Sequence, residues 1–542
     1  MPRRAALLVL AISLLAAGCG RSLSQAESDQ GEVSPTAGLV ATTPAGTKPV
    51  PSVTWAVYRD VNSLDPAFAF DYPENTAISL MCESLLLQQP NGNITAGLAS
   101  VSTPTPLKFV FTLRPGVTFW NGDPVTPADV VYSLDRQMST QLGGFYTDVF
   151  TRVKSIAATG SNQVTITMNQ PDYWLEGELA SMGGVIIQKS FAQAQGSKYG
   201  TPAGSIMCTG PYMLKSWTPS GGVVAVVNPD YWNKAVHPKV GEIIIKGVPD
   251  ITDFTAGMET GAIGGSYYFG VSTLSQLETA KDVKVYQGPG WSTDALIISA
   301  TSGPLTNVKV RQALSLALNR QSIISTVYRG AALMPKWLAN PGSFGYGTAV
   351  FDKAYAAAPS LTQNIAEAKK LVEEAGDVGQ TITIGTSNEI SSTAIETGAY
   401  QQAAEAIGLK VVLDSVSAQD FINFFTDPAY RKGVDAFTTI NYGDYADPMS
   451  LLDTLVLPNG DQNYDNYSDP QMTRLVDEAE STANPDQRAA LTVQAEELAA
   501  QQLPWIPTVQ PTNTLFLNRS LTGATASFAY MFAPWADDLG GK

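Results

Sequence analysis

Residues 107–137 read LKFVFTLRPGVTFWNGDPVTPADVVYSLDRQ, and this pattern fixes a strand at its start. Phe109, Phe111 and Leu113 alternate with Val and Thr, which is the two-residue period of a β-strand with one buried face. A Pro-Gly pair then interrupts the strand. The stretch therefore opens with a half-buried strand that ends in a break.

The second half of the stretch predicts a turn followed by a helix. Asn121 and Gly122 both tolerate positive φ, so their pairing is a strong signal for a tight turn. Thr126 can cap a helix, Pro127 suits the first helical position, and Asp129 stands where a capping box places its acid. Taken alone, the stretch is a well-packed piece of core that contains no chemistry.

The stretch also closely resembles the signature of family 5 extracellular solute-binding proteins, the peptide-binding type of receptor for ABC importers. Further segments resemble the same family in the same order, at residues 61–71, 208–232, 304–324 and 466–507. The resemblance covers nearly all of the chain after residue 52. It implies an α/β, two-lobed periplasmic-binding-protein-like fold with mixed sheets, of type II and of the large peptide-binder class.

Composition limits the other functions. The chain has 542 residues, enough for two lobes and a large core, and a net charge of −16, which argues against nucleic acid or anionic lipid as partners. A single histidine and three cysteines argue against a His-based or Cys-rich metal site. No cofactor is expected. The sequence contains no G-x-x-x-x-G-K-[ST], G-x-S-x-G or H-E-x-x-H motif, so we expect no enzyme.

The first residues have the shape of an export signal. Two arginines precede an apolar run at 5–17 that is too short to span a bilayer. The run ends before Cys19 in a pattern that resembles a bacterial lipobox, which implies a signal peptide over 1–18 and lipid on Cys19. The protein would then be anchored at the extracytoplasmic (periplasmic) face of the cell membrane. An ordinary export signal with an incidental cysteine is the alternative.

The expected domain limits follow from composition and from the resemblance. Residues 19–51 contain the lipidated cysteine and a flexible linker rich in Ser, Thr, Gly and Pro. Lobe I is expected over 52–290, with an inserted subdomain at about 88–195. Lobe II is expected over 291–508, and 509–542 return to lobe I. A strand–helix–strand pattern between Thr381 and Leu413 predicts a partly parallel sheet in lobe II.

Two cysteines remain once Cys19 is assigned to lipid. Cys82 and Cys208 form one pair, and exported proteins fold in an oxidising compartment, so we predict a Cys82–Cys208 disulfide. Two buried free thiols are the alternative, because the sequence does not give the distance between them.

The resemblance implies ligand-binding candidates in the first lobe. In family members the loop before the first helix lines the cleft, which makes Asp71 and Tyr72 candidates; a surface turn is the alternative. A family tyrosine that faces the ligand makes Tyr146 a candidate, with core packing as the alternative.

A run of aromatic residues gives further candidates. Tyr267, Tyr268 and Phe269 follow a predicted strand, and aromatic rings at a strand end make good pocket walls. Gly264 stands where the family usually has an acid. We expect at least one of the three rings to line the cleft and the others to join the core.

The strongest candidate follows a strand in the second lobe. Residues 441–445 read NYGDY, and Asp444 matches the family aspartate that pairs with the α-ammonium group of a peptide. A buried cation needs a charged, hydrogen-bonding partner. Asn441, Tyr442 and Gly443 are expected beside it, although Asn441 replaces a Trp that is common in the family. A turn-forming or helix-capping aspartate is the alternative.

The expected function is an extracytoplasmic receptor that captures short peptides and delivers them to the permease of an ABC transporter, acting as a monomer. The same role for haem, an oligosaccharide or a metal complex is the first alternative. A sensor or scaffold lipoprotein without a transport role, and a hydrolase using Asp444 with Asp447, are the others.

Overall fold

The strand predicted within residues 107–137 is present in the computed structural model, which describes residues 38–542 except 220, 268–270 and 389. It forms β5 (Lys108–Leu113), which buries Phe109, Phe111 and Leu113 on one face. The alternation in the sequence therefore predicted the correct buried face.

The predicted helix is α2 (Pro127–Gln137). The Thr126 hydroxyl accepts from the Asp129 backbone N–H, and the Asp129 carboxylate accepts from the Thr126 backbone N–H at 3.0 Å. These reciprocal bonds satisfy two backbone donors at the helix start, as the capping-box pattern predicted.

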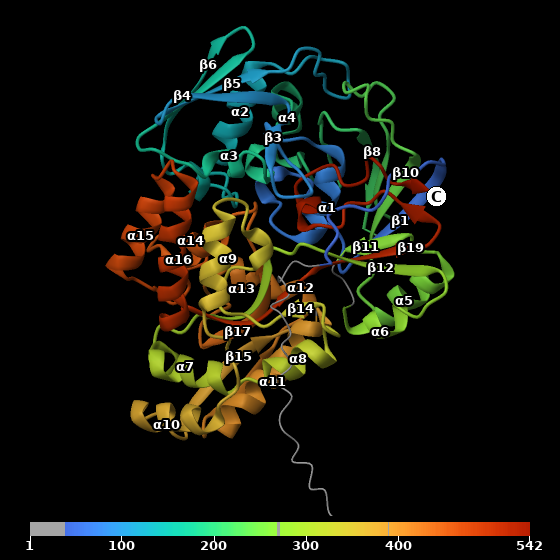
Figure 1. The fold of residues 1–542 in the computed structure, drawn as a ribbon. Helices are drawn as coiled ribbons and strands as arrows, with labels where there is room; N and C mark the ends of the chain where they lie inside the picture. Colours follow the sequence, from blue (N-terminus) through green and yellow to red (C-terminus); the bar gives the residue numbers. More distant parts are fainter. Residues whose placement is uncertain (1–37, 220, 268–270, 389) are drawn as a thin grey trace, which may run out of the picture. The chain divides into compact units, whose positions relative to one another are not determined.

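Lobe I is built on a seven-stranded mixed sheet (Figure 1). The strand nearest the start of the described chain, β1, pairs in parallel with a neighbour on each side, and the other pairings are antiparallel. The spatial order is β12 (Val283–Gly288), β19 (Asn513–Asn518), β11 (Gly265–Tyr267), β1 (Val50–Val57), β10 (Val240–Gly247), β9 (Gly222–Val227) and β8 (Tyr212–Thr218).

A second sheet is inserted between β1 and β8 in the chain and has its own apolar core. It is antiparallel, α2 packs against it, and a short hairpin precedes it. Its order is β4 (Ala99–Thr105), β5, β7 (Gln163–Met168) and β6 (Val153–Gly160), and the hairpin is β2 (Leu86–Gln88) with β3 (Ile94–Ala96). The helices of lobe I and its insert are α1 (Tyr72–Met81), α2, α3 (Leu175–Glu178), α4 (Lys189–Gln195), α5 (Ile251–Thr260) and α6 (Leu274–Leu277).

Lobe II contains a six-stranded mixed sheet. Its order is β14 (Ala332–Leu333), β18 (Trp505–Pro511), β13 (Ser292–Ile298), β17 (Ala436–Tyr442), β15 (Thr381–Thr386) and β16 (Lys410–Ser415). β15 and β16 pair in parallel and are joined by α11 (Ser391–Ala406), which confirms the strand–helix–strand prediction. The other helices are α7 (Val308–Ala317), α8 (Arg320–Thr326), α9 (Thr348–Ala357), α10 (Ile365–Ala375), α12 (Ala418–Phe421), α13 (Asn423–Thr426), α14 (Met449–Val456), α15 (Pro470–Glu480) and α16 (Pro485–Gln502).

The chain crosses between the two large sheets twice. The first crossing lies between Gly288, which ends β12, and Ser292, which begins β13. The second lies at Thr512, between β18 and β19. The return to lobe I thus comes slightly later than the expected residue 509, because β18 continues to Pro511 in the lobe II sheet.

The predicted linker over 19–51 is wrong for its last part. Within the described residues, Val40 donates to Gln287 at 2.9 Å and Thr43 to Ala524 at 3.1 Å through backbone bonds. A Cβ atom on Gly46 would lie 2.5 Å from the backbone of Gly540. This segment is held by backbone bonds and close approach rather than by an apolar face, so it lacks the periodicity that marks an ordered element.

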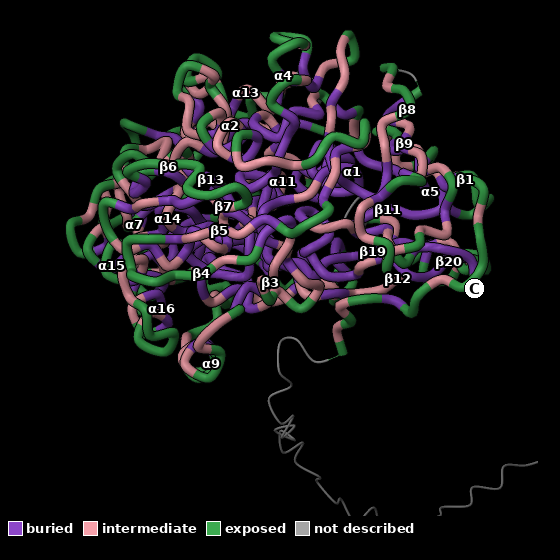
Figure 2. Tube along the Cα trace, turned by 90° about the horizontal axis from the view of Figure 1, so that it is seen from above, coloured by how far each residue is buried: buried purple, intermediate pink, exposed green. Residues whose placement is uncertain are grey.

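Cys82 and Cys208 form a disulfide in the structure, with Cα atoms 4.9 Å apart. Cys82 ends α1, and Cys208 precedes β8, so the bond ties a helix to the sheet of lobe I. Buried residues run through the interior of the described unit, and exposed residues lie on outer turns and helix faces (Figure 2). Cys19 lies outside the described residues.

Candidate ligand-binding site

A cavity of about 820 Å³ lies where the insert of lobe I meets lobe II. Lobe I supplies Phe70 and the two loops around residues 143–151 and 172–178, and lobe II supplies the residues after β17, α14 and the chain leading to α15. The aromatic rings of its wall are Phe70, Phe145, Tyr146, Trp174, Phe425, Tyr442 and Tyr464. Aromatic walls with a few polar groups are typical of small-molecule sites.

Asp444 lies in this wall, directly after β17. Its backbone N–H donates to Ser450 Oγ at 2.7 Å, and its carbonyl accepts from Gln88 Nε2 of lobe I at 2.6 Å. Among the described residues, nothing donates to its carboxylate or forms an ion pair with it. Burial, with a smaller contribution from Asp148, raises the pKa of Asp444 to about 7. The carboxylate is therefore ready to accept from a donor that enters the cavity.

Of the three residues before Asp444, two line the cavity and one does not. Asn441 lines the cavity and donates through Nδ2 to Gln462 Oε1. Tyr442 also lines it, and its hydroxyl donates to the Phe70 carbonyl of lobe I. Gly443 is buried and does not belong to the lining; a Cβ there would lie 3.1 Å from Ser450.

Tyr146 is placed in the cavity wall as a buried ring. Its hydroxyl donates to the Ala69 carbonyl at 2.7 Å, which fixes the orientation of the ring. Phe145 beside it packs edge to face on Phe70, with ring centroids 4.1 Å apart. The aromatic part of the lobe I wall is therefore held in a fixed orientation.

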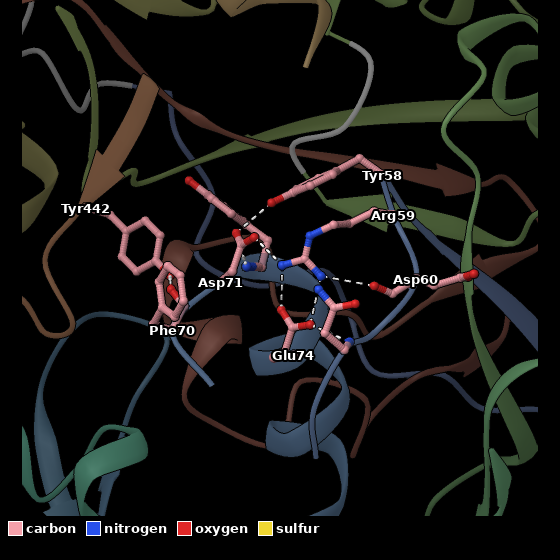
Figure 3. A network of polar contacts seen from close by, with 9 residues as sticks. Tyr58, Arg59, Asp60, Phe70, Asp71, Glu74 and Tyr442 are labelled. Carbon is pink, nitrogen blue, oxygen red and sulfur yellow. Dashed lines mark hydrogen bonds and ion pairs between the residues drawn. The ribbon is translucent and has the colours of Figure 1, made fainter. Parts of the chain in front are cut away.

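Asp71 and Tyr72 do not line the cavity. The Asp71 carboxylate accepts from the Tyr58 hydroxyl at 2.6 Å and pairs with Arg59, which also binds Glu74 (Figure 3). Asp71 is in addition the N-cap of α1. The Tyr72 ring lies behind Tyr442, 5.1 Å from it, so both residues support the wall from the lobe I side.

The three consecutive aromatics are not brought to the cavity as a group. Tyr267 is buried in the core of lobe I, where it stacks on Tyr530 with centroids 3.6 Å apart and packs on Trp55. Tyr268 and Phe269 lie outside the described residues.

Six acidic lining residues are not among the sequence candidates: Asp148, Asp172, Glu178, Asp453, Asp461 and Glu480. Asp453 carried a signal, since it lies within the apolar run LLDTLV of α14. An acid inside such a run is unusual unless it is paired or functional. Asp148 begins a single helical turn and Glu178 ends the short helix α3, and neither stretch of sequence contains a comparable signal.

Neither a metal site nor a membrane span is found in the part of the chain that the structure describes. Within residues 38–542, apart from the five undescribed positions, no group of three or more His, Cys, Asp or Glu is placed to hold a metal ion. No helix in that part is long and apolar enough to cross a membrane.

Comparison with known proteins gives a consistent match. Residues 93–463 match the family model described as the middle part of bacterial extracellular solute-binding proteins, family 5. Haem-binding protein A of Haemophilus influenzae is 26% identical over 74% of this chain and 76% of its own length. The oligopeptide-binding protein OppA of Bacillus subtilis is 24% identical over 85% of this chain and 88% of its own.

A solved structure shows the same fold. The periplasmic binding protein DppA of Helicobacter pylori, in complex with the peptide STSA, superposes with a TM-score of 0.81. It covers 91% of this chain and 98% of its own, at 20% identity. The expected α/β two-lobed periplasmic-binding-protein fold with mixed sheets is thereby confirmed.

Proposed function

Because the chain belongs to family 5 of the bacterial extracellular solute-binding proteins, which are receptors and not enzymes, we propose that its solute is a short peptide with a free amino terminus. The chain binds a small solute outside the cytoplasm and works with an ABC transporter. In the proposal it closes on the peptide and delivers it to the membrane permease, as a monomer held to the membrane by lipid on Cys19.

The observation that carries the proposal is the Asp444 carboxylate. It lies in a cavity between two lobes, and no donor among the described residues engages it. A peptide ammonium group carries both the charge and the hydrogen-bond donors that such a carboxylate lacks. The size of the cavity fits a ligand of a few residues.

The rest of the wall supports the same ligand. The rings of Tyr146, Phe145 and Phe70 offer apolar area for side chains, while the Tyr146 hydroxyl is engaged by the Ala69 carbonyl. In the proposal, Asn441 and Tyr442 border the amine site, and Gly443 allows α14 to approach. Asp71 and Tyr72 hold the wall in place rather than contact the peptide.

The first experiment is mass spectrometry of small molecules released when the purified, unlipidated protein is denatured. Short peptides would support the proposal and give their length. Haem, a sugar or another solute would overturn the peptide assignment. An empty protein would be tested by calorimetry with a tripeptide and its N-acetylated form, and equal binding of the two, or none, would contradict the role of Asp444.

A further inference from the structure

The cavity contains more carboxyl groups than one amino terminus requires. Among the described residues that line it, none is Lys, Arg or His. The acidic lining residues are Asp148, Asp172, Glu178, Asp444, Asp453, Asp461 and Glu480. Any ligand that enters therefore meets a wall of one sign of charge.

Three of these groups are accounted for by the protein or by solvent. Arg152 approaches Glu480 at 2.7 Å, which lowers the Glu480 pKa while burial and Asp172 raise it. Asp172 accepts from the backbone N–H groups of Trp174 and Leu175, at 2.9 and 3.0 Å. Asp461 is exposed to water.

The remaining groups, besides Asp444, are Asp148, Glu178 and Asp453. Within the described residues none of them pairs with a cation, and Asp148 accepts only from the Val149 backbone at 2.9 Å. They come from three different elements: a loop of the insert, the end of α3 and the middle of α14. The acidic wall thus spans both lobes.

A second observation points to a ligand at the same place. Trp174 lines the cavity and is only 5% exposed, and its Nε1 is buried without a partner among the described residues. Oδ1 of Asp453 is also buried without a hydrogen-bond partner among the described residues. An unsatisfied buried donor and acceptor are costly. A peptide carbonyl can accept from the Trp174 Nε1–H and a cationic nitrogen can donate to Asp453 Oδ1, so a ligand that supplies both groups gains affinity. The indole face is also a favourable neighbour for a cation.

The pKa shifts of the lining carboxyl groups agree with this arrangement. Burial, with Asp444 and Asp453, raises the pKa of Glu178, and burial with Asp148 raises that of Asp453. Burial and Asp461 raise the pKa of Asp148 to about 6. Tyr146 and Tyr442, which also line the cavity, bring no positive charge. A cation would favour the ionised carboxylates and remove their mutual repulsion.

We propose, on the basis of the proposed function, that the solute carries a second cationic nitrogen, as in a peptide with a Lys or Arg side chain. Asp444 binds the amino terminus, and Glu178 with Asp453 binds the side-chain cation beside the Trp174 ring. A small diamine presents the same pair of charges, so it belongs in the test.

The test is calorimetry with two matched tripeptides, one with lysine and one with N-ε-acetyl-lysine at the same position, scanned through the three positions. The wild-type protein should bind the better lysine peptide about 10-fold or more tightly than its acetylated partner. In the double variant Glu178→Gln, Asp453→Asn this preference should fall to about 2-fold or less. Asp444→Asn should weaken both peptides and keep their ratio.

Two controls separate charge from folding. Asp352→Asn, an exposed acid on α9, should leave both affinities unchanged. The midpoint temperature of thermal unfolding of the double variant should be no lower than that of the wild type, because the two substitutions remove like charges from a buried site.

The outcomes distinguish this inference from the proposed function. Equal binding of the two peptides overturns the second cation site and leaves the peptide function intact. Binding of spermidine or cadaverine without any peptide overturns the peptide function and supports the dication. Failure of both peptides and diamines to bind overturns both.

Discussion

At the scale of single residues, the role of Asp444 depends on what surrounds it rather than on its identity. Asp447, in the same sequence motif, is occupied: it accepts from the Met449 backbone at 2.9 Å and from the Tyr346 hydroxyl at 3.2 Å. The Asp444 carboxylate has no such partner among the described residues. The structure therefore bonds Asp447 to the first residue of α14 and leaves the Asp444 carboxylate without a donor among the described residues.

Asp444→Asn should weaken binding of a peptide with a free amino terminus by about 1.5–3 kcal/mol, the range for hydrogen bonds to charged groups. The amide keeps the volume but loses the charge. Calorimetry with free and N-acetylated forms of one peptide measures this. The exposed Asp352→Asn is a suitable control. Asp447→Asn is not, because it disturbs the bond to the Met449 backbone. An unchanged affinity in Asp444→Asn would show that Asp444 is not part of the site.

A second pair of acids lies buried in lobe II, away from the cavity. The Tyr328 hydroxyl bonds to Asp294 and, at 3.0 Å, to Glu396. A hydroxyl carries one proton, so it donates to one carboxyl group at a time, and a proton on the other carboxyl group satisfies the second contact. Burial raises the pKa of Asp294 to about 7, and burial with Asp294 raises that of Glu396.

This pair predicts a pH-dependent loss of stability. The folded protein binds more protons than the unfolded chain between the ordinary pKa of 3.8 and about 7, so the pair's contribution is complete below that window and is lost as the pH rises through it. Glu396→Gln should reduce this loss by about 1 kcal/mol or more. Urea unfolding from pH 4 to 8 checks it, with the exposed Glu497→Gln as control; a difference from wild type that does not change with pH contradicts it.

At the scale of elements, α1 is fixed at both ends. Its start is capped by Asp71, whose carboxylate also binds Tyr58 and Arg59, and its end is covalently linked through Cys82 to the residues before β8. No residue of α1 belongs to the lining of the cavity. It holds Phe70 and Tyr72 in position, and through them the Tyr442 ring of lobe II.

Loss of the disulfide should destabilise lobe I. The bond closes a loop with a sequence separation of 126, for which chain entropy gives an upper figure of about 4–5 kcal/mol. Unfolding of a Cys82→Ser, Cys208→Ser variant, compared with the wild type in oxidised and reduced form, measures it. If the variant matches the oxidised protein, the bond contributes nothing; peptide affinity should change little, because neither cysteine lines the cavity.

At the scale of the whole described unit, a few polar contacts join the lobes around the cavity. Arg152 of the insert binds Glu480 at 2.7 Å and Asp477 at 3.0 Å on α15, and the Tyr173 backbone donates to the Glu480 carbonyl at 2.9 Å. Tyr442 to Phe70 and Gln88 to Asp444 are the other contacts described above. In the proposed hinge motion, these contacts would break as the lobes open.

Arg152→Met should favour the open form. The guanidinium is 9% exposed and Glu480 13%, so we expect a cost to closure of about 1–3 kcal/mol, below the range for fully buried pairs. Peptide dissociation should quicken, and the radius of gyration in small-angle scattering should rise. Arg136→Met, which breaks an ion pair with Asp65 inside lobe I, is the matched control and should affect stability alone. If neither the peptide dissociation rate nor the radius of gyration changes, Arg152 does not stabilise the closed form.

The sequence predicted local features well where one short pattern decides the outcome. The capping box at Thr126, the strand at Phe109 to Leu113 and the parallel pair around α11 depend on neighbours within a few residues. The sequence did not predict structure that depends on backbone bonds between distant segments of the chain. Residues 40–50 pair with the C-terminal segment through backbone bonds, which no side-chain pattern announces.

The sequence by itself determined the family, the two-lobed fold and the identity of Asp444 as a candidate, because these depend on residue patterns that are contiguous in the chain. Only the tertiary structure decided that Asp71 forms an ion pair with Arg59 and that Tyr267 belongs to the core. It alone also brings Asp148, Glu178 and Asp453 to one cavity. The reason is physical: whether a polar or aromatic side chain is available to a ligand depends on partners from distant segments, which folding alone brings together.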